Sequence, residues 1–372
     1  MFIITGKDEL EIRVSRRELL RLAGAAGGAL AARSLGAALT GERTTAQAAT
    51  AREVSLLFTG GTWKEYFERM YARPFEKMKG ARVIFSVGDS GQQISRVIAE
   101  RSNERFDMLH MHQYNAAQLA ELDLLVPPDP KIVTNLADVD PAFRFSHFVG
   151  KVLAPFGLTY NTRRSPRKVA SWKDLWDPAF AGRVAVPKWE WVGQTWFYAV
   201  NRVWGGAESN IDPGIQKVRE LVQKNKAVIM NNVEHGINLF VTGEIWIAPF
   251  YTARAQQAKD AGAPVEFVFP EEGGLNWTFN LGIIKGRPTA SVALAQEFLN
   301  YTLDPVQQGQ FSVLTGYPPT NRRAVALLPK DARVLLTSQD MANLGKMRFD
   351  IKQILSNRDR HAERWNKEVL GS

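Results

Sequence analysis

Cysteine is absent from the 372-residue sequence. Its absence excludes disulfide bonds, thiol nucleophiles, cysteine-bound zinc and thioredoxin-type redox motifs, and it removes the lipid-bearing cysteine of a bacterial lipoprotein. Histidine is scarce as well, with five residues in the whole chain. In the motif His110-Met111-His112 we expect the two rings to face opposite sides of a strand, and no other histidine has a partner at ligand spacing. The sequence therefore predicts no metal site.

Long runs of one charge are also missing. The 47 Lys and Arg against 38 Asp and Glu leave a formal charge of +9. No run of five or more basic residues occurs, and this scatter argues against nucleic-acid recognition. The chain has no Gly-x-Gly-x-x-Gly after a predicted strand, no Walker loop and no Gly-x-Ser-x-Gly elbow. A solvated turn explains the adjacent Glu271 and Glu272 better than an acid–base pair does. We therefore expect no enzyme activity and no cofactor.

Apolar runs long enough to span a membrane are absent, and the amino end carries an export motif instead. Residues 15–21 read SRRELLR, and the weakly apolar stretch 22–39 that follows is interrupted by Arg33. This combination predicts a twin-arginine signal. Ala46-Gln47-Ala48 supplies a small-x-small cleavage pattern, so residues 1–48 form the expected signal peptide. An amphipathic first helix of the fold is the alternative. The signal predicts a soluble periplasmic protein without a lipid anchor.

The chain does contain enough apolar material for a large core. Hydrophobic residues make up 45% and aromatic residues 10% of a chain that exceeds one ordinary domain, so two lobes are expected. Short β-rich runs alternate with amphipathic helices, which predicts an α/β fold built on largely parallel sheets. The expected strands are 54–58, 81–87, 106–112, 151–161 with interruptions at Pro155 and Gly157, 183–187, 227–230, 245–250, 265–270 and 275–284.

Helices are expected where apolar residues recur at helical spacing behind a capping residue. One begins at the capping-box spacing Thr62-x-x-Glu65 and runs to about Met78. A short helix capped by Ser171 stops before Pro178. The others lie around 94–98, after Tyr114, at 192–204, 233–241 and 252–261, and from 291 onward, where the chain becomes mainly helical.

Strand-to-helix turns carry the candidate binding residues. In open α/β sheets, ligands bind beyond the carboxyl ends of the strands, where turns and helix amino ends converge. Glycine permits close backbone approach there, helix amino ends offer free N–H groups, and aromatic faces stack on a solute or bind an ammonium. Turn chemistry and core packing are the alternatives for each residue taken singly. The predicted ligand-binding residues are Gly61, Thr62, Trp63, Ser90, Gln113, Tyr114, Trp189, Glu190, Trp191, Asn232, Tyr251 and Trp277.

Further motifs follow one another at a characteristic spacing. They are 170–182 (ASWKDLWDPAFAG), 243–247 (GEIWI), 268–274 (VFPEEGG) with Trp277, and 298–305 (FLNYTLDP) followed by 316–321 (GYPPTN). In these motifs the chain resembles the extracellular solute-binding proteins of ABC importers. Within that group it is similar to the spermidine/putrescine-binding branch. The resemblance covers most of residues 52–330.

This resemblance implies a fold, a function and a set of partners. The fold is a two-lobe, type II periplasmic-binding-protein-like flytrap of mixed sheets flanked by helices, with two interlobe crossovers near 150–160 and 270–284. The function is capture of a small solute (polyamine-like, amino acid-like or another small amine or zwitterion) and its delivery to an inner-membrane permease with its ATPase. A monomer is expected. The implied domains are the signal peptide 1–48, the first part of lobe 1 at 49–155, lobe 2 at 156–272, and the completion of lobe 1 with the C-terminal helices at 273–372.

The chain departs from the polyamine-binding branch at its acidic positions. Members of that branch hold amines with carboxylates and stack the methylenes on aromatic rings. Trp277 and Tyr114 match two of those rings, but Phe279 stands where an Asp is expected. Lys188-Trp189 replaces an acidic pair and leaves Glu190 as the nearest acid. The ligand therefore remains open between a small amine, a zwitterion and an anion. An enzyme or a solute sensor on the same two-lobe fold is the alternative function.

Replacing Arg16 and Arg17 together by Lys should leave the precursor in the cytoplasm, because the twin-arginine route reads the arginine pair itself. Cell fractionation followed by immunoblotting measures the export. Arg13→Lys, outside the pair, is the matched control and should be exported normally. Normal export of the double variant would contradict the assignment.

Overall fold

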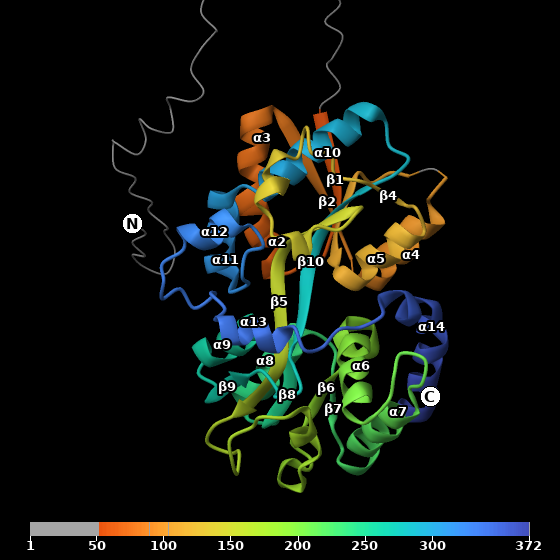
Figure 1. Cartoon of the computed structure of the whole chain (residues 1–372), viewed down its shortest axis with the longest axis vertical. Helices are drawn as coiled ribbons and strands as arrows, with labels where there is room; N and C mark the ends of the chain where they lie inside the picture. Colours follow the sequence, from red (N-terminus) through yellow and green to blue (C-terminus); the bar gives the residue numbers. More distant parts are fainter. Residues whose placement is uncertain (1–51, 89, 103, 372) are drawn as a thin grey trace, which may run out of the picture. The chain divides into compact units, whose positions relative to one another are not determined.

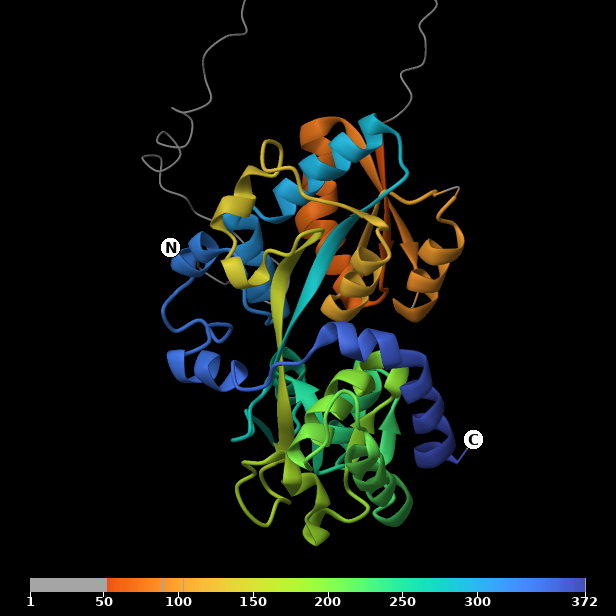
Figure 2. The same cartoon turned by 45° about the vertical axis from the view of Figure 1, so that its right-hand side comes forward.

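The computed structural model describes residues 52–88, 90–102 and 104–371. The predicted signal peptide, 1–48, lies outside the described residues. Figures 1 and 2 show the described chain as two groups of helices and strands joined by two long strands, β5 (Phe148–Asn161) and β10 (Leu275–Ile284). Within the described ranges, no helix is both long enough and apolar enough to cross a membrane.

The chain up to β5 alternates strands with helices, and the strands predicted there are confirmed. These elements belong to the first group, at the top of Figure 1. They are β1 (Arg52–Phe58), α2 (Thr62–Phe67), η1 (Glu68–Ala72), α3 (Arg73–Lys79), β2 (Ala81–Val87), α4 (Ser90–Ala99), β3 (Met108–His112), α5 (Gln113–Glu121), β4 (Leu125–Val126), η2 (Thr134–Asp138) and η3 (Pro141–Phe143).

The helix after β1 starts on a glycine cap. Gly61 has φ 72° and ψ −166°, and its carbonyl oxygen accepts hydrogen bonds from the amides of Lys64 at 3.0 Å and Glu65 at 3.3 Å. The predicted capping box on Thr62 is wrong, since Thr62 is already the first helical residue and no side chain caps this end. Glycine adopts this positive φ without steric cost. The N-cap is therefore Gly61, one residue before the predicted cap Thr62.

The large sheet is mixed. Its strand order is β2-β1-β3-β10-β5-β8, with β4 paired to β10 and β9 paired to β5. β1 runs parallel to β2 and β3, whereas each pairing described for β5 and β10 is antiparallel. The prediction of largely parallel pairing is therefore wrong for this sheet, because an apolar run carries no information about strand direction. The α/β class with mixed sheets flanked by helices is confirmed.

Helices cover both faces of this sheet, as β1 illustrates. Leu56 and Phe58 belong to a core that includes α2, α3 and α10 (Thr289–Thr302), whereas Leu57 belongs to a second core with α4 and α5. Successive residues of a strand point to opposite faces. A strand that is covered on both faces is apolar along its whole length, which explains the continuous apolar run at the end of β1.

β5 continues through Pro155 and Gly157, so the predicted interruption is wrong. Every residue of β5 is buried. Its first part pairs with β10, and the part from Phe156 onward pairs with β8 (Ile247–Tyr251) and β9 (Val265–Val268). A Cβ at Gly157 would lie 2.5 Å from the carbonyl oxygen of Val268. Glycine here permits a neighbouring strand to approach and does not end the strand.

The second group, at the bottom of Figure 1, follows β5 in the chain. The predicted short helix is confirmed, with Ser171 and Asp174 forming its capping box. β6 and β7 pair in parallel as a separate two-stranded sheet. Besides β8 and β9, the elements are η4 (Trp172–Trp176), η5 (Pro178–Phe180), β6 (Ala185–Pro187), η6 (Trp189–Gly193), α6 (Gln194–Val203), α7 (Asp212–Arg219), η7 (Glu220–Lys224), β7 (Val228–Met230), α8 (Val233–Thr242) and α9 (Thr252–Asp260).

The chain after β10 is mainly helical, as predicted, and its last α-helix touches both groups. The Tyr198 hydroxyl of α6 lies 2.7 Å from Nδ1 of His361. Nη1 of Arg358 donates to Oε1 of Gln118 in α5 at 2.5 Å. Both contacts belong to α14 (Ile351–Arg364). The remaining elements of this part are α10, α11 (Pro305–Thr315), α12 (Arg322–Leu327), α13 (Ser338–Leu344) and η8 (Trp365–Leu370).

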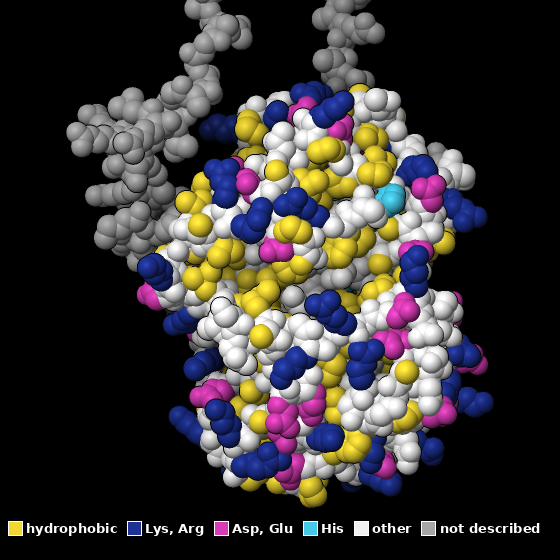
Figure 3. Space-filling view, viewed as in Figure 1, with side chains coloured by type: hydrophobic (Ala, Val, Ile, Leu, Met, Phe, Trp, Pro, Cys, Tyr) yellow, Lys and Arg dark blue, Asp and Glu magenta, His cyan; other side chains and the backbone are white. Residues whose placement is uncertain are grey.

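Charges of both signs are spread over the surface. Figure 3 shows Lys and Arg interspersed with Asp and Glu on the face drawn there, with apolar side chains between them. The formal charge of +9 is thus not gathered into a basic patch on this face. This distribution agrees with the argument against nucleic-acid recognition.

A lysine is buried in the core of the first group. The register of β5 and β10 shifts between Phe279 and Asn280, which leaves Lys151 as a bulged residue. Its side chain is fully buried, and Nζ has no hydrogen-bond partner among the residues that the structure describes. Nζ lies 3.3 Å from the ring centroid of Phe311 and 4.6 Å from that of Tyr71. Burial lowers the pKa of Lys151 well below its ordinary value.

Lys151→Met should raise the free energy of unfolding by at least ~1 kcal/mol at pH 7, because it removes an unpaired polar group from the core. The lowered pKa means that the unfolded chain binds a proton that the folded chain does not. Stability then rises with pH up to the ordinary lysine pKa near ~10, and the gain from Met should be smaller at pH 10 than at pH 7. Urea denaturation at both pH values measures the difference.

Lys285→Met is the matched control, since Lys285 is exposed and paired with Asp123 at 2.6 Å. Its effect should stay within about 0.5 kcal/mol. A loss of stability for Lys151→Met at both pH values would instead mean that the surrounding rings hold a charged ammonium.

Candidate functional site

The ends of β3 and β8 meet β10 at a cluster of aromatic rings that come from both the first and the second group of elements. Phe279 of β10 lies among them, with ring centroids 5.3 Å from Trp63, 6.2 Å from Tyr251 and 5.6 Å from Tyr317. Trp63 belongs to α2, Tyr251 ends β8, and Tyr317 follows α11. We call this group the aromatic cluster; its members are Trp63, His110, His112, Tyr251, Trp277, Phe279 and Tyr317.

The two histidines of β3 lie on the same face, so the prediction that their rings face apart is wrong. Phe279 is stacked against His110 at 5.6 Å and meets His112 edge-on at 5.5 Å. Residues two apart on a strand share a face because side chains alternate with period two. The described residues contain no group of three or more His, Cys, Asp or Glu that could hold a metal ion.

One nitrogen of each imidazole has a hydrogen-bond partner within the cluster, whereas Nδ1 of His110 has none among the described residues, and both rings stay neutral near neutral pH. Nε1 of Trp63 donates to Nε2 of His110 at 3.3 Å, and the Tyr251 hydroxyl lies 3.2 Å from Nε2 of His112. Burial lowers the pKa of His112 to about 4 and lowers that of His110 well below its ordinary value. The cluster is therefore an uncharged and largely buried group of rings.

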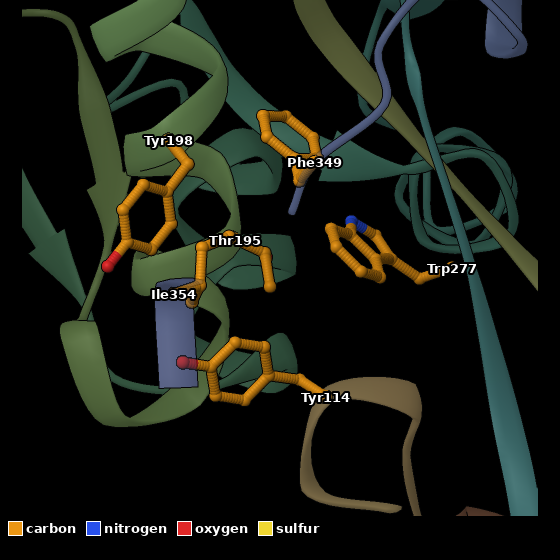
Figure 4. A pocket seen from close by; sticks show the side chains of 6 residues that line it. All are labelled: Tyr114, Thr195, Tyr198, Trp277, Phe349 and Ile354. Carbon is orange, nitrogen blue, oxygen red and sulfur yellow. The ribbon is translucent and has the colours of Figure 1, made fainter. Parts of the chain in front are cut away.

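Beside the cluster, Trp277 borders a narrow space that we call the gap. Figure 4 shows its side chains converging from α5, α6, β10, α14 and the segment before α14. The space has no room for a water-sized sphere. Phe349 lies almost parallel to Trp277, with ring centroids 6.1 Å apart and an interplanar angle of 11°. The lining residues are Tyr114, Thr195, Tyr198, Trp277, Phe349 and Ile354.

Two of the residues that line the gap each carry a buried hydrogen-bond donor without a partner among the described residues. Nε1 of Trp277 donates no hydrogen bond in the described chain, and the hydroxyl of Tyr114 makes none there, although their residues are only 5% and 1% exposed. An unpaired buried donor costs ~1–3 kcal/mol. Burial also raises the pKa of Tyr114, so the phenol keeps its proton. A ligand that supplies acceptors would remove this cost.

The buried carboxylates of the described chain all have other partners, outside the aromatic cluster and the gap. Each is held by an arginine or by backbone amides, in the pairs Asp107–Arg287, Asp174–Arg167, Glu208–Arg202 and Glu104 with the amides of Arg105 and Phe106. The interior of the site therefore contains no charged carboxylate, and the charged side chains of the site lie at its edge.

One acid and three arginines lie at that edge, among them Arg202, whose guanidinium lies 4.9 Å from the Phe349 ring centroid. Oε1 of Glu234 is 4.0 Å from where a Cβ on Gly61 would lie. Burial raises the pKa of Tyr317, and the Glu234 charge adds to that effect while Arg254 opposes it. Nε of Arg254 donates to the Tyr317 hydroxyl at 3.1 Å. The Arg358 guanidinium lies 5.9 Å from the Tyr114 ring centroid.

The structure brings a subset of the predicted site residues together. Trp63, Tyr251 and Trp277 belong to the aromatic cluster, and Tyr114 lines the gap. Gln113 is adjacent, since its Oε1 accepts a hydrogen bond from Thr278 of β10 at 3.2 Å. These residues come from α2, α5, β8 and β10, which are far apart in the sequence.

The other predicted residues lie outside the cluster and the gap, with Gly61 at the edge beside Glu234, and their roles stay predictions. Trp189 packs in the second group against Phe197 at 5.5 Å and Trp365 at 5.4 Å. Exposed Glu190 lies 3.7 Å from Lys188. The remaining members are exposed Gly61 and Thr62, half-buried Trp191, Asn232, which caps α8 by accepting from the amide of His235, and Ser90, the first residue of α4.

Several residues of the site escaped the sequence analysis. Tyr317 lies within the motif 316–321, so its neighbourhood was visible although its role was not. His112 belongs to the turn with Gln113 and Tyr114 at a predicted strand end, so its place was visible although it was not among the chosen residues. Glu234 looked like an ordinary first-turn acid of α8. Phe349 has no local signal, because the chain around it is irregular.

Comparison with known proteins identifies similar chains over most of this length. The family model for bacterial extracellular solute-binding proteins matches residues 70–334. Spermidine/putrescine-binding periplasmic protein 1 of Haemophilus influenzae is 25% identical over 281 residues, which cover 73% of this chain and 77% of that protein. The gamma-aminobutyric acid-binding protein of Pseudomonas aeruginosa is 22% identical over 301 residues, which cover 77% of this chain and 82% of that protein.

A solved structure supports the fold. An ABC transporter substrate-binding protein from Bradyrhizobium japonicum aligns with a TM-score of 0.71 over 86% of this chain and 99% of that chain. The two sequences are 21% identical. Similarity at this level shows a shared periplasmic-binding-protein-like fold.

Trp277→Ala should weaken solute binding at least tenfold, about 1.4 kcal/mol, because it removes both a ring of the cluster and a donor of the gap. Trp189→Ala should instead lower the free energy of unfolding by ~3–5 kcal/mol, the usual cost of truncating a buried aromatic residue. Isothermal titration calorimetry and urea denaturation separate the two effects. Equal affinity of wild type and Trp277→Ala would place that ring in the core, and a binding defect with normal stability would place Trp189 in the site.

Proposed function

The chain belongs to the bacterial extracellular solute-binding protein family, and from that premise we propose that it is the substrate-binding component of an ABC importer. In this proposal residues 1–48 direct export by the twin-arginine route, and the mature protein acts in the periplasm as a soluble monomer without a lipid anchor. It captures its solute between lobe 1, residues 49–155 and 273–372, and lobe 2, residues 156–272. It then delivers the solute to an inner-membrane permease with its ATPase and catalyses no reaction itself.

The two buried, unpaired donors of the gap carry the proposal for the solute. Nε1 of Trp277 and the Tyr114 hydroxyl lack acceptors, and a carboxylate offers acceptors on both of its oxygens. The Arg358 guanidinium near the Tyr114 ring adds positive charge at the edge of the same site. We therefore assign the gap to the carboxylate end of a solute.

The aromatic cluster suits an ammonium. The faces of Trp63, Tyr251 and Tyr317 attract a cation by ~0.5–2 kcal/mol each. The imidazoles of His110 and His112 do not repel a cation, because burial keeps them neutral. The Glu234 carboxylate near Gly61 supplies the opposite charge at the edge. We assign the cluster to the amine end of the solute.

A small ω-amino acid has both ends and is the solute we propose. Spermidine and putrescine, named for the Haemophilus relative, carry an amine at each end, and a second amine would meet donors and Arg358 instead of acceptors. The Pseudomonas relative is named for gamma-aminobutyric acid, which carries one amine and one carboxylate. Phe279 replaces an expected Asp and lies between two neutral imidazoles. The loss of this carboxylate also favours a solute with one amine over a polyamine.

In a thermal-shift assay of the chain from Ala49, gamma-aminobutyric acid should stabilise the protein more than putrescine, spermidine or butyrate at equal concentration. A ligand at 100 times its dissociation constant adds ~2.7 kcal/mol to stability. Butyrate tests the amine end and putrescine tests the carboxylate end. Stabilisation by putrescine and spermidine alone would contradict the proposed solute while leaving the importer role intact.

The same assay identifies the acidic partner. Glu234→Gln should reduce the shift, whereas Glu190→Gln is the matched control, because exposed Glu190 is paired with Lys188. The opposite ranking of the two variants would assign the ammonium to Glu190.

A further inference from the structure

The C-terminal segment brings an aromatic ring to the site from outside the family match. The match ends at residue 334, whereas Phe349 lies in the irregular stretch 345–350 between α13 and α14. Its ring is held on two sides. Trp277 lies at 6.1 Å, and the Arg202 guanidinium lies 4.9 Å from the ring centroid. Arg202 also donates a hydrogen bond to the backbone carbonyl of Arg348.

α14 anchors this segment on both parts of the chain. Arg358 donates to Gln118, and Lys352 lies 3.5 Å from Glu121, both in α5. On the other side, His361 meets Tyr198 at 2.7 Å, and Arg364 pairs with Asp212 at 2.7 Å. The contacts of α14 with both groups therefore hold Phe349 at the gap.

The gap can admit a solute only if one of its walls moves. Tyr114, Tyr198 and Ile354 are buried on helices, and Trp277 is buried in the central strand β10. Phe349 is half-buried and belongs to neither helix nor strand. Moving Phe349 breaks no backbone hydrogen bond of a helix or strand. Among the lining residues, it is therefore the one whose displacement costs the least free energy.

We propose that Phe349 is a specificity-determining residue of the solute site, where its ring covers Trp277 and sets the length of the solute that can bind. The inference rests on the proposed function, because it concerns the same site. The Phe349 ring lies beside Trp277, one of the two residues with an unpaired donor, and limits how far a bound chain extends past that residue. A smaller residue at 349 admits a longer chain, and a larger residue excludes it.

The test compares 4-aminobutyrate with 6-aminohexanoate by isothermal titration calorimetry. In Phe349→Ala, the affinity for the six-carbon acid relative to the four-carbon acid should rise at least tenfold. In Phe349→Trp the same ratio should fall below the wild-type value. Met347→Ala is the matched control, because Met347 lies on the same segment but is not among the lining residues of the gap. Its Cγ lies 2.9 Å from where a Cβ on Gly273 would lie, and the ratio for this variant should equal that of wild type.

The outcomes separate this inference from the proposed function. If wild type binds 4-aminobutyrate and neither variant at 349 changes the ratio, Phe349 does not determine specificity, while the proposed function stands. If neither acid binds wild type or any variant, the proposed solute class fails and the inference fails with it. Binding of 6-aminohexanoate by Phe349→Ala alone supports the inference. If circular dichroism shows that Phe349→Ala is unfolded, Phe349→Leu and Phe349→Trp carry the same test.

Discussion

The antiparallel pairing of β5 with β10 is the interaction on which the rest of the structure depends. Both strands are long, every residue of β5 is buried, and β5 goes on to pair with β8 and β9 beyond Leu275, the first residue of β10. Because of this pairing, Tyr251 of β8 and the histidines of β3 both lie against Phe279 of β10. The site therefore depends on strands whose geometry is set by backbone hydrogen bonds.

Desolvation determines the chemistry of that site. The same burial that keeps His110 and His112 neutral also leaves the Tyr114 hydroxyl and the Trp277 indole without partners. Buried polar groups normally have a partner, because leaving one unpaired is costly. An uncharged and largely buried group of rings next to unpaired donors, with charged residues at its edge, can recognise a small solute by its two ends. It offers little to a ligand that is cationic along its length.

Lys151 and Phe349 both pack against buried aromatic rings, with different consequences for the protein. Lys151 enters the aromatic core through a bulge in β5 and meets rings of α11 and η1, where its amine has no partner in the described chain. Phe349 reaches it from a segment that has no regular structure of its own. The first feature affects how stable the fold is, and the second affects what the site admits. Both come from chain segments that meet only in the folded protein.

The sequence by itself determined which segments are strands and helices, because apolar spacing and capping residues such as Ser171 act over a few residues. It also determined the family, through motifs whose order is visible in one dimension, and it marked Trp63, Tyr114, Tyr251 and Trp277 as candidates. Only the tertiary structure decided the direction of strand pairing, the shared face of His110 and His112 against Phe279, and the approach of Phe349 to Trp277. These features depend on contacts between residues far apart in the chain, and no local pattern encodes such contacts.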